Sequence, residues 1–216
     1  MSSILKVDQL QDSGGNAIIT SDGSGTITPS FNNAGNLVKI DSQSGTAQSD
    51  LADVRIELPE TYKAFKLYWR WKPETDNVNL YAKFSTDGGS SYYNSAGNYK
   101  LASFYIYTST DNQIDNNYSD SDSILHVSKT VGNNTANGEG NSFIMDIQPI
   151  DTESSVKQQN IVHWSGTRMD NSNAIRGMFG VGSLEATYTD KINYILFYPS
   201  SGNIEDYFYT LYGVRN

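Results

Sequence analysis

The segment 85–92, Ser-Thr-Asp-Gly-Gly-Ser-Ser-Tyr, has the residue types and spacing of an Asp-box, Ser-x-Asp-x-Gly-x-Ser-aromatic. A carboxylate at Asp87 can accept backbone N–H bonds inside a tight turn, the adjoining glycines tolerate positive φ, and the ring packs behind the hairpin. We therefore predict a structural turn made by Ser85, Asp87, Gly89 and Tyr92. Asp-boxes also occur in sialidases and other carbohydrate-active proteins, away from the catalytic centre, so a glycan contact is the alternative.

Tyrosines are concentrated in and after this motif, and the chain has 15 of them. Amphipathic rings suit stacking on sugars or a subunit interface. Cross-strand packing within a core is the competing interpretation and the one we favour. The candidates for a surface or glycan contact are Tyr92, Tyr93, Tyr99 and Trp164.

Four carboxylates crowd the polar stretch 111–122, at Asp111, Asp115, Asp120 and Asp122. Oxygen ligands in a flexible loop suit Ca²⁺, but the spacing lacks the glutamate that closes an EF-hand loop. We expect a solvated surface loop, with a structural Ca²⁺ near Asp111–Asp122 as the alternative and no cofactor.

Nothing in the sequence has the pattern of a catalytic centre. The two histidines, His126 and His163, fall within strand patterns, and we expect structural roles for both. No nucleophile elbow or glycine-rich phosphate loop can be read. Carboxylate pairs for glycoside hydrolysis need no local motif, so they stay open as a minor alternative. We expect that the protein is not an enzyme.

Composition and charge narrow the class of protein. Only 37% of the residues are hydrophobic, but an aromatic share of 12% indicates a folded chain with long polar loops. The formal charge of −9 disfavours nucleic acid as a partner. There are no cysteines, the first residues lack the features of a signal peptide, and no apolar run could cross a bilayer. We expect synthesis in a cytoplasm and no membrane insertion.

From residue 51 onward the sequence predicts about ten short strands and no helix. Phe65, Leu67, Trp69 and Trp71 alternate with polar or charged residues, the period of a half-buried strand. The run 101–107 is apolar at nearly every position, which predicts a central strand. In 190–216, two apolar-aromatic runs flank a glycine-bearing turn, which predicts a hairpin whose outer strand closes a sheet. The predicted fold is all-β, an antiparallel jelly-roll-like β-sandwich over 51–216.

The first thirty residues form a separate block. Two β-prone triplets flank a glycine-bearing turn at 21–25, which predicts a hairpin that is marginal by itself in water. We therefore expect residues 1–30 to be an attachment and oligomerisation arm, followed by a polar connector at 31–50. The candidate anchoring residues are Ile4, Val7, Leu10, Ile18, Ile19 and Ile27.

Several segments, in this order, resemble one family. The opening Ser-Ile-Leu-Lys-Val-Asp-Gln-Leu-Gln-Asp (3–12), the body segments 71–77 and 84–92, and Leu-Tyr-Gly-Val (211–214) resemble small virion structural proteins of tailed bacteriophages, largely those of marine bacteria and cyanobacteria. Members of this family are tail-fibre-like proteins, head fibres or capsid decorations.

This resemblance implies a virion protein made in the host cytoplasm. We expect a homotrimer in which the arm anchors a short fibre or capsid decoration to other virion proteins, while the sandwich projects outward and contacts the host surface. A carbohydrate-binding module for recognition of a host glycan is the alternative.

Overall fold

The computed structural model describes residues 9–11, 13–15, 17–21, 23–24, 27–29, 37–107, 114–135, 138–151, 159–170, 172, 174–186 and 190–214. The chain divides into two compact units, Met1–Asn36 and Leu37–Asn216, and each is described by itself.

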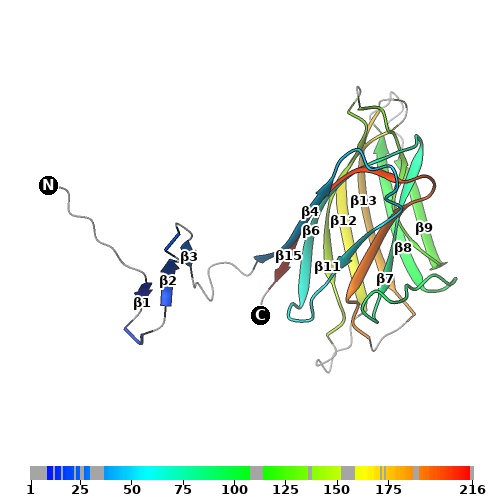
Figure 1. Ribbon diagram of the computed structural model, residues 1–216. Coiled ribbons are helices and arrows are strands. Elements are labelled where there is room, and N and C mark those ends of the chain that lie inside the picture. The colour runs from blue at the N-terminus through cyan, green and yellow to red at the C-terminus, as the bar shows by residue number, and fades with distance from the viewer. Residues whose placement is uncertain are drawn as a thin grey trace. The chain divides into compact units, whose positions relative to one another are not determined.

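The N-terminal unit is a three-stranded antiparallel sheet in the order β1-β2-β3 (Figure 1). Its strands are short: β1 (Gln9–Gln11), β2 (Ala17–Ser21) and β3 (Ile27–Pro29). The predicted hairpin corresponds to β2 and β3, in which Thr20 pairs with Thr28. A third strand, β1, pairs with β2 and widens that hairpin into a sheet.

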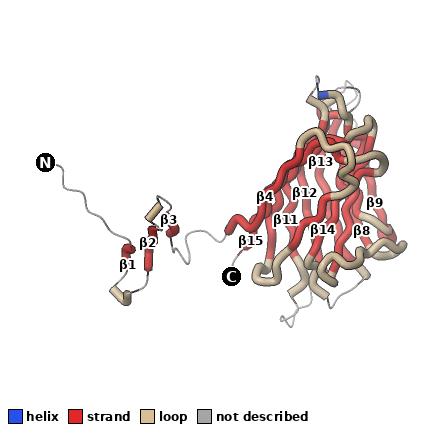
Figure 2. The backbone as a smooth tube through the Cα atoms, in the orientation of Figure 1, coloured by secondary structure: helices blue, strands red, loops and turns tan. Residues whose placement is uncertain are grey.

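The larger unit is an antiparallel β-sandwich, which confirms the predicted fold class (Figure 2). Its large sheet has the order β4-β15-β6-β11-β12-β13-β8-β9, and its small sheet has the order β10-β7-β14-β5. The chain crosses repeatedly between the two sheets, as it does in jelly rolls. The large-sheet strands are β4 (Leu37–Gly45), β6 (Ala64–Pro73), β8 (Tyr99–Tyr107), β9 (Ile114–Asp122), β11 (Gly140–Gln148), β12 (Asn160–Met169), β13 (Ile175–Leu184) and β15 (Ile204–Val214). The small-sheet strands are β5 (Val54–Glu57), β7 (Val78–Ser85), β10 (Leu125–Val131) and β14 (Tyr194–Pro199).

The core lies between the two sheets and is rich in aromatic rings. Trp69 on β6 is buried, and its ring centroid lies 4.6 Å from that of Phe197 on β14 in the opposite sheet. The neighbouring rings of Phe143 and Tyr209 stack beside it at 6.3 and 6.1 Å. Because strand side chains alternate between faces, this core leaves the other face of the large sheet outside the sandwich.

Three details differ from the sequence-based expectations. The boundary between units falls after Asn36, and β4 pairs with β15, so residues 37–50 belong to the sandwich unit rather than to a connector. The predicted C-terminal hairpin is wrong: β14 pairs with β5 and β7 in the small sheet, whereas β15 pairs with β4 and β6 in the large one. The turn at 200–203 is therefore a crossover between layers, which local sequence does not distinguish from a hairpin turn.

The third difference concerns β8. It pairs with β13 and with the outermost strand, β9, and so lies one strand from the edge of the sheet. Its residues alternate between buried and exposed positions. Apolar residues on its second face are therefore exposed outside the sandwich instead of being covered by a second layer.

Candidate interaction surfaces

The outer face of the large sheet carries two features that suit contact with another molecule. One is a region at the β9 side of the sheet with no charged side chain. The other is a cleft at the β15 side, around a buried lysine. Both are made by strands whose inward side chains form the core, so the fold holds them in fixed positions.

The region without charge covers three outward-facing positions on each of four neighbouring strands. On each strand these positions are every second residue, counted from the first, of the ranges 163–167 in β12, 177–181 in β13, 102–106 in β8 and 114–118 in β9. Strand register aligns them across the sheet. None of them is an aspartate, glutamate, lysine or arginine, although such residues make up 18% of the chain. We call this surface the uncharged block. Its large exposed side chains are Phe104, Ile106, Ile114, Tyr118, Phe179 and Val181.

Two phenylalanines form the centre of the uncharged block. Phe104 on β8 and Phe179 on β13 are cross-strand partners, and their rings stack with centroids 5.1 Å apart. Gly177 lies beside them, and a Cβ built there would meet its nearest neighbours at 3.8 and 3.9 Å. The block thus combines a projecting aromatic pair with a shallow position that lacks a side chain.

The cleft lies at the other side of the same face and has a volume of about 550 Å³. This volume falls in the range of small-molecule sites. Its lining includes Arg70, Lys72, Glu139, Ser142, Asp206 and Phe208. Phe208 presents a half-exposed ring, and Ser142 supplies a hydroxyl group.

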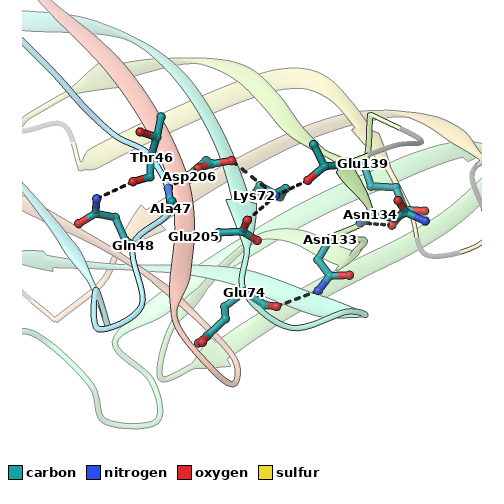
Figure 3. Close-up of polar contacts among 11 residues, drawn as sticks. Thr46, Ala47, Gln48, Lys72, Glu74, Asn133, Asn134, Glu139, Glu205 and Asp206 are labelled. Atoms are coloured by element: carbon teal, nitrogen blue, oxygen red, sulfur yellow. Dashed lines mark hydrogen bonds and ion pairs between the residues drawn. The ribbon is translucent and has the colours of Figure 1, made fainter.

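Lys72 is one of three buried ionisable residues that line this cleft, with Glu139 and Arg168, and its ammonium group has several partners (Figure 3). It donates to Glu205 Oε1 at 2.7 Å and to Thr135 Oγ1 at 2.6 Å, and lies 3.5 Å from Asp206 Oδ2. Two carboxylates next to one lysine compensate its charge. Lys72 therefore fixes the end of β15 against β6.

Arg70 is the cleft cation whose side chain is accessible to a ligand. Its side chain is exposed, and no carboxylate in the described ranges forms an ion pair with it. With the Phe208 ring on the neighbouring strand β15 and hydroxyl groups close by, it makes a surface suited to sugar hydroxyls and to an acidic substituent.

The Asp-box begins at Ser85, the last residue of β7, and continues into the turn that follows. Asp87 Oδ1 accepts from Ser91 N at 3.0 Å and from Ser85 Oγ at 2.7 Å, and Asp87 Oδ2 accepts from Ser91 Oγ at 2.6 Å. These hydrogen bonds, that from the Ser91 hydroxyl foremost, lower the pKa of Asp87 to about 2. Gly89 has φ +78°, in the left-handed region, and Tyr92 is half-buried. Because these hydrogen bonds to the Asp87 carboxylate all come from within the turn, the carboxylate stabilises the loop.

The four proposed glycan-contact residues do not lie on one surface. Tyr99 and Trp164 are buried, so the expectation of a surface contact is wrong for these two. The Tyr99 hydroxyl donates to Tyr93 O at 3.0 Å, and Trp164 Nε1 donates to Val127 O at 3.0 Å, so both rings serve the core. Tyr92 and Tyr93 border a hollow of about 350 Å³ beside the Asp-box.

The anchoring residues proposed for the arm are only partly described. Ile4 and Val7 lie outside the described residues, and nothing is described for the side chains of Ile18, Ile19 and Ile27, which are in β2 and β3. Leu10, in β1, is exposed.

The acidic stretch is a strand over residues 114–122, so the expectation of a loop is wrong for that part, whereas Asp111 lies outside the described residues. Asp115 accepts from the Tyr107 hydroxyl at 3.2 Å, and Asp122 lies 3.3 Å from His126 Nε2. No group of three or more potential metal ligands occurs among the described residues. In the same parts of the chain, no helix is both long enough and apolar enough to span a membrane.

Comparisons with known proteins do not place the chain in a family. No protein-family profile matches it, and no curated protein matches it. Among solved structures, a chain in "Structure of infectious bursal disease virus Gt strain" aligns with 89% of this chain at 9% identity and a TM-score of 0.12. The alignment spans 45% of that viral chain, and a likeness this low carries no argument.

Sequence reasoning missed the residues that define both surfaces. Phe104 and Ile106 are visible as apolar residues on the second face of 101–107, but that pattern predicts a central strand. Phe179, Arg70 and Phe208 gave no local signal, because the surfaces form only when distant strands pair.

Proposed function

We propose that this protein is a structural component of a tailed-bacteriophage virion, a trimeric short fibre or capsid decoration. In this proposal the N-terminal unit attaches it to other virion proteins, and the sandwich projects outward. It is made in the host cytoplasm and then installed on the particle. It acts by assembly and not by catalysis.

The observation that carries the proposal is the division of the chain into a small sheet unit and a large sandwich. The three strands β1–β3 hold too few residues for a core of their own, and sheets this small gain stability by packing on a partner. The ordered resemblance of segments 3–12, 71–77, 84–92 and 211–214 to phage virion proteins supports the same conclusion.

Deletion of residues 1–36 tests the anchoring role. We expect the truncated protein to keep its sandwich, because residues 37–216 form a compact unit with its own core. Its copy number on purified particles should fall by about tenfold or more, since the loss of a few kcal/mol of attachment free energy has that effect on occupancy. Quantitative mass spectrometry of gradient-purified phage gives the copy number, and circular dichroism reports the fold.

The full-length protein, expressed from the same position in the phage genome, is the control. Normal decoration by the truncated protein would contradict an anchoring role for the N-terminal unit. Absence of the full-length protein from purified particles would contradict the virion proposal itself.

The second candidate function is recognition of a host carbohydrate, and the cleft favours it. A half-exposed ring, a cation with no partner carboxylate among the described residues and several hydroxyl groups surround about 550 Å³. These are the elements with which proteins hold sugars: stacking on the ring and hydrogen bonds at the rim. A fibre or decoration that also binds the host surface would use both functions.

A glycan array followed by calorimetry tests this candidate. For a sugar that binds in the cleft, Phe208→Ala should raise Kd by about tenfold, which corresponds to roughly 1.4 kcal/mol of stacking. Tyr68→Ala is the matched control, since Tyr68 is an exposed aromatic residue on the same face outside the cleft. Equal effects of the two substitutions, or no binding to any glycan, would remove the cleft from consideration.

A further inference from the structure

The uncharged block is a large apolar surface that the described part of the chain leaves open. Its six large side chains have exposed fractions of 42% (Phe104), 43% (Ile106), 68% (Ile114), 80% (Tyr118), 40% (Phe179) and 40% (Val181). If a large side chain exposes roughly 200 Å² in full, these fractions amount to about 600 Å². A typical monomer has a largest apolar patch of about 300–600 Å², and a stable protein interface buries about 800 Å² on each partner. The block is therefore of the size that a protein partner covers.

We propose that the uncharged block is the surface through which copies of this chain associate. This surface would supply the contact that closes the trimer, and in that respect the inference rests on the proposed function. In this arrangement the strands β12, β13, β8 and β9 of each copy face one another, and the aromatic pair is buried between them.

Charge is the first reason for choosing a second copy as the occupant. Each chain has a formal charge of −9, so two copies repel one another over most of their surface. The block contains no carboxylate, which lets two acidic chains approach there without placing like charges in contact. An oppositely charged partner would instead be drawn to the acidic surfaces outside the block.

Surface relief is the second reason. Phe104 and Phe179 project from the block, whereas Gly177 has no side chain, and a hollow of about 410 Å³ borders the block beside Tyr118 and Val181. Because projections and hollows lie on the same surface, a projection of one copy can enter the hollow of the next, and three such contacts can close a ring. A partner ring can enter the hollow while the aromatic pair enters the equivalent hollow of the next copy.

The edge of the large sheet next to the uncharged block indicates that copies of the chain contact one another through the outer face of the sheet. The outermost strand, β9, carries Asp115, Asp120 and Asp122. Charged side chains on an edge strand discourage the addition of another strand. At this edge, copies of the chain are therefore expected to pack on the face and not to extend the sheet.

The test measures the native mass of the full-length protein by mass spectrometry and analytical ultracentrifugation. The wild type should have three times the chain mass of 23.9 kDa. Phe104→Lys and Phe179→Lys should each weaken association by about 100-fold or more, because a buried, unpaired ammonium is costly at an interface centre. Phe208→Lys is the matched control: its ring is 43% exposed on the same face but lies outside the block. It should leave the mass unchanged.

A second measurement covers the case in which a lysine variant fails to fold. The protein contains no cysteine, so a single introduced thiol reports only on contacts between chains. Ser165→Cys lies in the block and should be cross-linked between chains by a short bis-maleimide, whereas Ser90→Cys, in the exposed Asp-box turn, should not.

A monomeric wild type, unchanged mass for both lysine variants, equal loss of association in Phe208→Lys, or equal cross-linking at the two thiols would each overturn the inference. Failure of the proposed function is recognised separately, by the absence of the wild-type protein from purified particles. A protein that is present on particles but unaffected by Phe104→Lys would refute the block alone.

Discussion

Trp69→Ala is expected to lower the free energy of unfolding by about 3–5 kcal/mol, the cost of removing a large aromatic side chain from a packed core. Trp69 is buried and lies against Phe143 and Tyr209 in its own sheet and against Phe197 in the opposite sheet. The cavity would therefore open between the two layers. For a unit of this size, thermal unfolding should shift down by about 10 °C or more.

Thermal and urea unfolding followed by circular dichroism measure this loss. Trp69→Phe is the informative companion, because it keeps most of the ring while removing an indole N–H for which no described residue acts as acceptor. We expect it to cost less than half as much as the alanine substitution, since the volume lost is smaller and a buried unpaired donor disappears. If Trp69→Ala lost less than about 1 kcal/mol, the ring could not be central to the packing between sheets.

Gly166→Ala should destabilise the sandwich by about 3 kcal/mol, at the upper end of the range for overpacking. Gly166 on β12 is the cross-strand partner of Phe143 on β11. A Cβ added there would overlap the carbonyl oxygen of Ser142 and lie 2.6 Å from Phe143 Cα. Both are backbone atoms of the neighbouring strand, so no rotation of a side chain can relieve the overlap.

Gly177→Ala is the control for this substitution. It also places alanine at a strand glycine of the large sheet, but the nearest atoms would be 3.8 Å away, an ordinary contact distance. Because Gly177 belongs to the uncharged block, the two glycine variants are compared in the Phe104→Lys background, in which copies are expected to dissociate. There we expect a change within about 0.5 kcal/mol for Gly177→Ala, as for surface positions. Equal unfolding midpoints for the two variants in urea would show that the strands β11 and β12 do not approach as closely as described.

Strands with strong apolar alternation could be predicted from sequence, whereas polar ones could not. Phe65 to Trp71 alternates between apolar and polar residues and is found in β6. Ile114 to Asp122 is a strand of similar length, but its asparagines, serines and aspartates have low β-propensity. The sequence therefore predicts a loop there, but pairing with β8 overrides the low propensity.

Which aromatic side chains are buried could also not be predicted from the residues next to them in the sequence. Tyr99 and Tyr92 lie close in sequence, yet Tyr99 is buried in β8, whereas Tyr92 is half-buried in the loop before it. Burial depends on which face of a strand meets the opposite sheet, and strand period alone does not reveal that. The same ambiguity hid Phe104, whose strand has apolar residues on both faces.

Local sequence alone determined the all-β class, the separate N-terminal block and the turn at Asp87, because strand periodicity, turn chemistry and composition act over a few residues. Tertiary structure alone decided that β14 and β15 join different sheets, that residues 37–45 complete the large sheet, and that Phe104 and Phe179 meet on its outer face. These outcomes depend on the pairing of strands far apart in the chain. Such pairing is selected by the packing of the whole core, which no short segment encodes.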